Sequence, residues 1–262
     1  METALITGAS SGIGYELAKI FAKNKINLVL VARNGVKLKN LKKEIEEEAE
    51  KKNYQISVSI IVADLSATNS PEKVFNQLQK DDISIDYLVN NAGFGVFGKF
   101  QDTDINKEQK MINLNILSLT KLTKLFLPQM LEKKKGKIMN VASTAAFQPG
   151  PLMAVYFASK AYVLFFSEAL SKELKGTGIT VTALCPGPTE SKFQEEASMK
   201  NSKVMKKKLV SSEKVAKYGY KAMFKGKKVA IQGLRNKMLA FSVRLFPRSL
   251  VSSLTYSMMK EA

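Results

Sequence analysis

The side chains best suited to acid–base chemistry lie between residues 143 and 160. Tyr156 follows Ser143 by thirteen positions, and Lys160 follows Tyr156 by four. Residues four apart share one face of a helix, so a helix over 152–175 would place the Tyr156 phenol beside the Lys160 ammonium. A phenol has a pKa near ~10, and a neighbouring cation lowers it. Tyr156 could then act as a general acid or base, with Ser143 hydrogen-bonding the oxygen that Tyr156 protonates.

The absence of some residue types limits the catalytic mechanisms that this chain can use. The sequence has no histidine and one cysteine, Cys185. Catalysis by a Ser-His-Asp or Cys-His set is therefore excluded, no metal site is expected, and proton transfer has to use Tyr, Lys, Asp or Glu. One cysteine cannot form an intrachain disulfide, which favours a reducing, cytoplasmic setting. Taken alone, Tyr-x-x-x-Lys fits an ordinary helix surface better than a site, so its context decides.

A glycine-rich turn, Thr7-Gly-Ala-Ser-Ser-Gly-Ile-Gly14, joins an apolar run at 3–7 to a helical pattern at 12–23. Glycines allow a tight turn and the close approach of a phosphate, and a helix N-terminus offers N–H groups to it. The first strand–helix turn of an α/β chain is where a dinucleotide site is expected. The residues expected to bind the cofactor here are Gly8, Ser10, Ser11, Gly12, Ile13 and Gly14.

The end of the second predicted strand bears on the choice of cofactor. In an NAD site, an acidic side chain at this position hydrogen-bonds the ribose 2′-hydroxyl. Here the chain has Arg33 and Asn34, and the next acid is Glu44. Because a guanidinium can pair with a 2′-phosphate, the sequence predicts NADP(H). Cofactor contacts are also expected where the third and fourth strands end, at Asp64, Leu65, Asn91, Ala92 and Gly93.

Strand and helix patterns alternate through most of the chain, which calls for a parallel sheet with helices on both faces. Strands are predicted at 3–7, 27–32, 56–62, 85–89, 137–142, 179–184 and 228–232. Helices are predicted at 12–23, 35–52, 71–80, 104–132, 152–175 and 212–224, with Pro128 bending or ending the long one. The fold class is thus α/β, a doubly wound sheet of about seven strands in a single domain.

The region after Pro186 is less regular. Residues 188–210 are polar and lysine-rich, and they follow a strand's carboxyl end, which suggests a lid within a substrate-binding region at 188–227. Residues 234–260 have apolar positions at helical spacing, divided by Pro247. Residues 203–262 hold 15 Lys and Arg against two acids, hence +13 of the net +18. This basic tail is either a solvated face or a contact with anionic lipid or an acidic partner.

Taken together, these motifs resemble the short-chain dehydrogenase/reductase family. The resemblance rests on the turn at 7–14, Asn90-Asn-Ala-Gly93, Ser143, Tyr156-x-x-x-Lys160 and Pro186-Gly-Pro-Thr189, and it covers residues 3 to about 190. It implies a Rossmann-type fold, with a cofactor-binding and catalytic core at 1–187 and a last strand and tail at 228–262. Within the family, the segments 140–143 and 183–189 resemble a bacterial group of general ketone and ketoacyl reductases, which in turn resembles membrane-associated eukaryotic reductases.

The resemblance also implies residue roles. Tyr156 would be the acid/base, Lys160 would lower its pKa and bind the nicotinamide ribose, and Ser143 would orient the substrate oxygen. An Asn of the long helix would complete a proton relay; Asn115 fits the family pattern better than Asn113, and both stay open. Pro186, Gly187 and Thr189 would contact the nicotinamide.

The predicted function is NADP(H)-dependent oxidoreduction of a carbonyl or secondary alcohol. A hydrophobic ketone or ketoacyl substrate is expected because apolar residues surround the motifs: Phe94, Phe97, Phe147, Pro149, Pro151, Leu152 and Met153. The alternative is an NADP(H)-binding regulatory protein with little turnover. A homo-oligomer, dimer or tetramer, is expected and nucleic acid is not, since no binding motif accompanies the charge. The tail is expected to pack on the core or on another subunit, with a membrane surface as the alternative.

Overall fold

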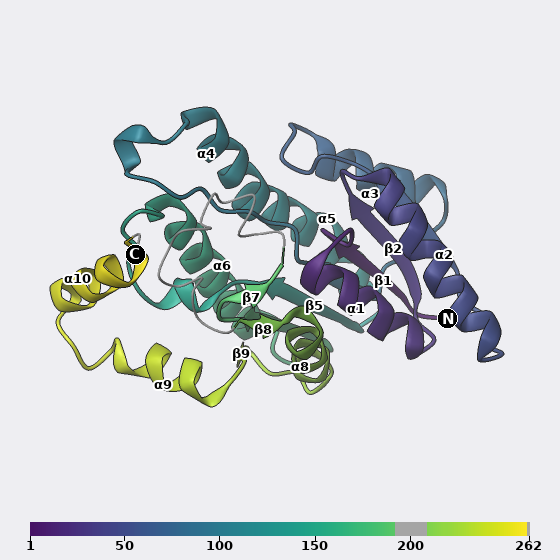
Figure 1. Cartoon of the computed structure of the whole chain (residues 1–262). Coiled ribbons are helices and arrows are strands. Elements are labelled where there is room, and N and C mark those ends of the chain that lie inside the picture. Colours follow the sequence, from purple (N-terminus) through teal and green to yellow (C-terminus); the bar gives the residue numbers. More distant parts are fainter. Residues whose placement is uncertain (192–208, 261–262) are drawn as a thin grey trace.

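Seven parallel strands form the centre of the molecule in this computed structural model, which describes residues 1–191 and 209–260 (Figure 1). The strands are β1 (Thr3–Thr7), β2 (Asn27–Ala32), β3 (Val58–Val62), β4 (Tyr87–Asn90), β5 (Gly136–Val141), β6 (Ile179–Cys185) and β9 (Val229–Ile231). Their order is β3-β2-β1-β4-β5-β6-β9. The chain starts at β1, moves outward to β3 and returns to β4 on the other side of β1. Open α/β sheets bind ligands at such a reversal.

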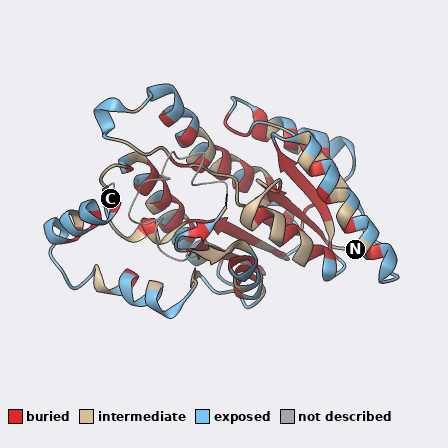
Figure 2. Cartoon of the chain, viewed as in Figure 1, coloured by how far each residue is buried: buried red, intermediate tan, exposed pale blue. Residues whose placement is uncertain are grey.

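Helices cover both faces of the sheet (Figure 1). One layer holds α1 (Gly12–Lys23), α2 (Gly35–Lys51) and α8 (Ser212–Phe224), and the other holds α3 (Ser70–Lys80), α5 (Leu119–Glu132) and α6 (Ala154–Glu173). Successive strand residues point to opposite faces. Ala4 and Ile6 of β1 thus join the first apolar cluster, and Leu5 joins the second. The sheet is buried between the layers (Figure 2). The predicted fold class is confirmed.

The helix predicted at 104–132 consists of three segments. They are α4 (Ile105–Ile112), a π-helical turn η2 (Asn113–Ser118) and α5. Of the two outcomes predicted for Pro128, a bend or an end of the helix, the end is wrong, because α5 runs on to Glu132. Phe126 and Met130, on either side of this proline, are fully buried. Their packing outweighs the backbone hydrogen bond that a proline removes.

The remaining strand and helix predictions agree with the structure to within about two residues at each end. Short elements were not foreseen: the 3-10 helices η1 (Phe100–Asp102) and η3 (Thr144–Phe147), and the paired strands β7 (Thr189–Glu190) and β8 (Val210–Ser211). The ends of the proposed lid thus form a small parallel sheet. Its remaining residues, 192–208, lie outside the described part of the chain.

The tail forms two helices, α9 (Leu234–Ser242) and α10 (Arg248–Met259), at one end of the molecule (Figure 1). The predicted division at Pro247 is confirmed, since this residue is the N-cap of α10. In the part of the chain that the structure describes, no helix is both long and apolar enough to span a bilayer.

Candidate active site

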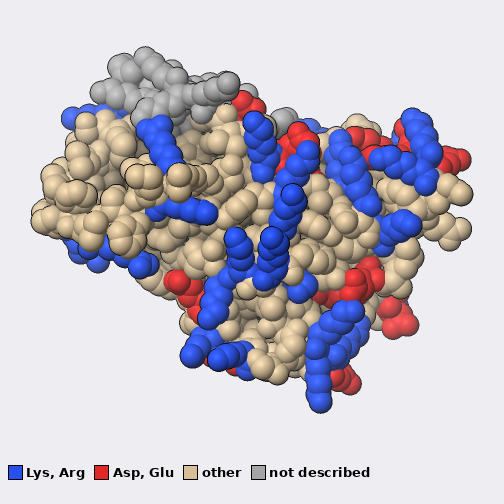
Figure 3. Space-filling view, turned by 90° about the horizontal axis from the view of Figure 1, so that it is seen from below, with Lys and Arg blue, Asp and Glu red and all other residues tan. Residues whose placement is uncertain are grey.

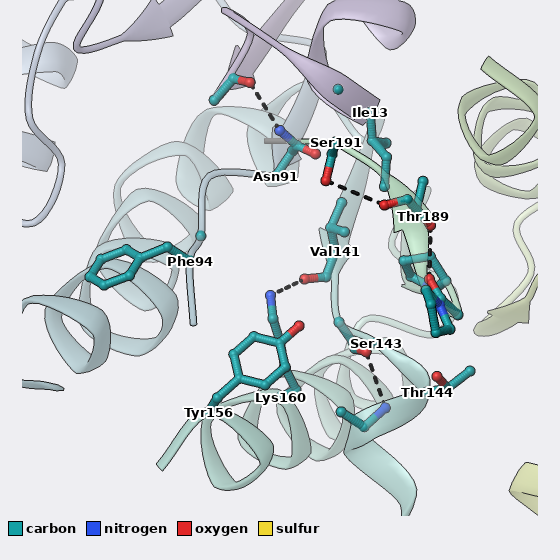
Figure 4. A pocket seen from close by; sticks show the side chains of 18 of the residues that line it. Ile13, Asn91, Phe94, Val141, Ser143, Thr144, Tyr156, Lys160, Thr189 and Ser191 are labelled. Atoms are coloured by element: carbon teal, nitrogen blue, oxygen red, sulfur yellow. Dashed lines mark hydrogen bonds between the residues drawn. The ribbon is translucent and has the colours of Figure 1, made fainter. Parts of the chain in front are cut away.

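A cavity of about 930 Å³ lies at the carboxyl ends of the strands. The cavity is lined by the glycine turn before α1 at one end and by the tail helices at the other. Arg33, Asp64, Ser143 and Tyr156 line it between them. Several loops that follow strands meet here because the carboxyl ends of parallel strands share one edge of a sheet. Figure 4 shows part of this wall.

The glycine turn has the geometry that a phosphate-binding turn requires. Gly8 and Gly12 have φ values of +67° and +58°, a backbone conformation that residues other than glycine rarely adopt. Gly8, Ser10, Ser11, Gly12 and Ile13 line the cavity, and the Ser11 side chain does not cap α1. The turn therefore fits a pyrophosphate at the N-terminus of α1.

Gly14 has a packing role and is not part of the wall. A Cβ atom on Gly14 would lie 2.5 Å from both the Gly8 carbonyl oxygen and the Asn91 Nδ2 atom. The Asn91 Nδ2 atom donates to the carbonyls of Thr7 (2.8 Å) and Gly8 (3.3 Å), and the Thr7 hydroxyl accepts from the amides of Asn91 and Ala92. These bonds tie the turn after β1 to the end of β4, and Asn91, Ala92 and Gly93 all face the cavity (Figure 4).

The ends of β2 and β3 form the side of the cavity farther from Tyr156. Arg33 is exposed and lines the wall, whereas Asn34 caps α2 by accepting from the Lys37 amide and is not in the wall. Asp64 and Leu65 also line it. Burial raises the pKa of Asp64, but hydrogen bonds from Ser66 and the charge of Arg33 outweigh burial, so its pKa lies below the usual value. Asp64 therefore stays ionised beside Arg33.

Ser143, the N-cap residue of η3, and Tyr156 and Lys160 of α6 converge on the same cavity (Figure 4). Tyr156 and Lys160 are only 9% and 6% exposed. The Lys160 Nζ atom donates to the Val141 carbonyl (2.8 Å) and lies 5.8 Å from the centroid of the Tyr156 ring. Ser143 Oγ accepts from the Ala145 amide (3.1 Å), and the Ser143 hydroxyl also hydrogen-bonds the Tyr156 phenol.

Burial dominates the electrostatics of these groups. It raises the pKa of Tyr156 to about 12, against the lowering effect of the Ser143 hydrogen bond. It lowers the pKa of Lys160 to about 8. The expectation that Lys160 lowers the Tyr156 pKa is not met in the protein alone. The phenolate is disfavoured by its apolar surroundings, and the Lys160 nitrogen is directed at a backbone carbonyl. Tyr156 is thus a protonated acid at neutral pH.

The two candidate asparagines of the long helix lie in different surroundings. Asn115 is buried, with Nδ2 donating to the Phe94 carbonyl and the Ser159 hydroxyl (3.0 Å each) and Oδ1 accepting from the Phe94 amide (3.2 Å). Asn113 donates to the Ser66 carbonyl instead. Asn115 is behind the cavity wall, 2.9 Å from where a Cβ atom of Gly93 would lie. It therefore positions the 93–94 loop and α6.

The predicted nicotinamide contacts lie where β6 ends. Pro186, Gly187 and Thr189 line the cavity, and the Thr189 hydroxyl donates to the Gly187 carbonyl (2.8 Å). A Cβ atom on Gly187 would lie 2.6 Å from Asn236 Nδ2, so this glycine lets the start of α9 approach.

The apolar part of the wall differs from the prediction. Of the seven apolar residues expected there, Phe94 and Met153 line the cavity, while Phe97, Phe147, Pro149, Pro151 and Leu152 do not. Phe147 packs instead on the cluster around Val163, because η3 turns it away. The missing surface comes from α6 and from the tail: Phe157, Leu239, Ala240, Thr255, Met258 and Met259. The tail's helical period was visible in the sequence, but its docking site was not.

Comparison with known proteins agrees with this geometry. The family model described as short chain dehydrogenase matches residues 2–202. The chain belongs to the short-chain dehydrogenase/reductase family. The family resemblance drawn from the motifs is therefore confirmed.

Individual relatives have related activities in their names. The chain is 37% identical over 190 residues to a very-long-chain 3-oxoacyl-CoA reductase of Rattus norvegicus, covering 71% of this chain and 58% of the relative. A protein of the same name from Anas platyrhynchos is 39% identical over 189 residues, covering 70% and 58%. The chain thus matches less than two thirds of the length of these relatives.

Solved structures match over almost the whole chain. A short-chain dehydrogenase from Sphingobium yanoikuyae in complex with NADPH gives a TM-score of 0.82 at 31% identity, covering 93% of this chain and 94% of the other. A bulky-bulky ketone specific alcohol dehydrogenase from Comamonas testosteroni gives 0.78 at 30% identity, covering 94% and 92%.

Proposed function

We propose that this chain is an NADP(H)-dependent oxidoreductase acting on a carbonyl group or the corresponding secondary alcohol. The observation that carries the proposal is the single cavity that joins the glycine turn to Ser143, Tyr156 and Lys160. A cofactor in the turn and a substrate at Tyr156 would share this space. The bound cofactor supplies the hydride.

The residues of the chain handle the oxygen and the proton. In the reducing direction, Tyr156 donates its phenolic proton to the substrate oxygen, and the Ser143 hydroxyl hydrogen-bonds the same oxygen. Burial, which raises the pKa of Tyr156 to about 12, keeps the proton in place until the substrate oxygen becomes basic. Lys160, with a pKa near 8, can exchange a proton with water near neutral pH and would hold the nicotinamide ribose. Asn115 acts through the 93–94 loop as a positioning residue.

The preference for NADP(H) over NAD(H) rests on Arg33. It lines the cavity at the end of β2, where no acid is present to hold a ribose 2′-hydroxyl. A guanidinium there can bind a 2′-phosphate through two hydrogen bonds. The Sphingobium yanoikuyae structure, which contains NADPH, supports the same choice.

We assign the substrate to the hydrophobic ketones and ketoacyl compounds. The wall beyond Tyr156 is formed by apolar side chains, notably Met153, Phe157, Leu239 and Met258. The relatives named as 3-oxoacyl-CoA reductase and as bulky-ketone alcohol dehydrogenase support this class.

The test is NADPH oxidation by the purified full chain with a panel of ketoacyl thioesters, bulky ketones, steroids and sugars. For the best substrate, Tyr156→Phe should lower kcat/KM by roughly 10²- to 10⁴-fold while NADPH binding stays within a few-fold. Undiminished turnover in this variant would refute the assigned acid. NADPH binding without turnover of any compound would favour the regulatory alternative.

We also infer that the chain forms a homo-oligomer through the face shared by η2 and α6. Leu117 of η2 and Phe165 of α6 are exposed there at 48% and 65%, and Tyr162 of α6 hydrogen-bonds Thr120 at the start of the adjoining α5. Light scattering should show that Phe165→Asp lowers the molecular mass in solution; an unchanged mass would exclude this contact.

A further inference from the structure

The tail helices expose an unusual amount of apolar surface. Ten of the twenty exposed large hydrophobic side chains in the described residues lie between Leu234 and Met258, about a tenth of the chain. Leu234, Met238 and Leu245 are 74%, 65% and 67% exposed, and Phe241 is 60% exposed. Contiguous apolar patches of this kind usually mark a contact site.

The exposed residues form stripes along both helices. On α10, Val251, Thr255 and Met259 are buried against the body of the protein, whereas Leu250, Leu254 and Met258, each one position earlier, are exposed. On α9, Leu234, Met238 and Phe241 recur at the spacing of one helix face. The body of the protein thus covers one stripe of α10 and leaves a second apolar stripe uncovered.

The charges around these stripes have one sign. Residues 214–260 contain no Asp or Glu. Arg235, Lys237, Arg244, Arg248 and Lys260 are exposed, and within the described residues none of them lies in a salt bridge. At the end of the molecule occupied by the tail, Figure 3 shows a broad uncharged surface with Lys and Arg side chains at its margin.

We propose that α9, α10 and the 243–247 connector together form a docking surface for an anionic lipid bilayer. Helices that lie on bilayers combine exposed Leu, Met and Phe with Lys and Arg at the edges, as here. A second copy of the chain fits less well, because a two-fold contact through this surface would bring like charges together. An acidic phospholipid surface complements both the apolar stripes and the cations.

The docking surface is continuous with the cavity. Leu234, Leu239 and Met258 are exposed and also line the cavity wall. A bilayer seated on the tail would therefore lie at the cavity mouth. This orientation suits the apolar substrate class, and only this last step depends on the proposed function.

The test is flotation of the full chain with phosphatidylcholine vesicles, with or without 30% phosphatidylglycerol. We expect binding to the anionic vesicles that weakens as salt is raised. The double variant Arg244→Glu and Arg248→Glu should lower the binding constant by about fivefold or more for each residue, the effect of one cation near an anionic surface. Leu245→Asp with Phe246→Asp should abolish binding. None of these four residues lines the cavity, so turnover of a water-soluble substrate should stay unchanged.

Matched controls change similar residues elsewhere. Phe100 and Ile105 are 68% and 69% exposed near α4, so changing both to Asp should leave vesicle binding intact. Lys172→Glu with Lys175→Glu, at the far end of α6, should do the same. Equal loss in controls and tail variants, or no binding by the wild type, would overturn the proposal. So would a fall in solution mass caused by the Leu245 and Phe246 changes, which would assign the surface to a second copy of the chain.

Discussion

The buried Lys160 should make the protein less stable than it would be with an apolar side chain in its place. The pKa of this ammonium falls from its ordinary 10.5 to about 8 because burial disfavours the charged form. Each pKa unit corresponds to about 1.4 kcal/mol, so holding the charge costs roughly 3 kcal/mol near pH 7. Lys160→Met removes this cost but leaves the Val141 carbonyl without its hydrogen bond, a loss of about 1 kcal/mol. The variant should be about 2 kcal/mol more stable than the wild type near pH 7.

The pH dependence identifies the cause. A basic group whose pKa is lowered by folding destabilises the folded state when it is charged. This cost is absent above the unfolded-state pKa, grows as the pH falls, and is fully present below the folded-state pKa, here about 8. The advantage of Lys160→Met should therefore shrink by about 2.5 kcal/mol between about pH 7 and about pH 10, reaching roughly zero. Urea unfolding of the cofactor-free chain, followed by circular dichroism at both pH values, measures this change.

The matched control is Lys172→Met, an exposed lysine on the same helix, which should differ from the wild type by less than ~0.5 kcal/mol at either pH. A free-energy difference between Lys160→Met and the wild type that is the same at both pH values would refute the reasoning. It would mean that the buried charge does not govern the stability change.

Three further substitutions, two of them with a matched control, test the site. Gly14→Ala should cost ~1–3 kcal/mol in thermal unfolding because its Cβ meets backbone and Asn91, whereas Gly35→Ala, whose nearest neighbour is the movable side chain of an exposed valine, should be neutral or slightly stabilising. Arg33→Asp should lower kcat/KM for NADPH by roughly 30-fold or more and change the NADH value little; equal losses would contradict 2′-phosphate binding. Asn115→Leu removes three hydrogen bonds and should cost ~2–4 kcal/mol in urea unfolding, against ~1 kcal/mol for Asn113→Leu.

The sequence was sufficient to predict the sheet, because strands buried on both faces read as continuous apolar runs separated by amphipathic helices. It also placed the glycine turn and Tyr156 on the correct elements, since local patterns fix their position. The sequence did not predict properties that depend on contacts between distant parts of the chain. The Tyr156 pKa depends on how apolar the assembled cavity is, and the direction of the Phe147 side chain depends on the 3-10 turn that ends at this residue.

The π-helical turn shows the same limit. Ideal helical geometry separates Asn113 from Asn115 but does not reveal that the helix widens between them. Nothing in the residue types marks such a turn. Its effect on the 93–94 loop becomes visible only once Asn115 is seen bonded to Phe94.

Most of the cavity wall comes from two separate stretches of the chain. The glycine turn, Arg33 and Tyr156 all come from the first 190 residues, whereas Leu239, Ala240 and Met258 come from the tail. Under the proposed function, a change of tail would therefore alter which substrates bind without disturbing the cofactor-binding residues. This arrangement makes the tail the natural unit to exchange in a chimaera, with the junction in the loop before β9, where the sheet is already complete up to β6.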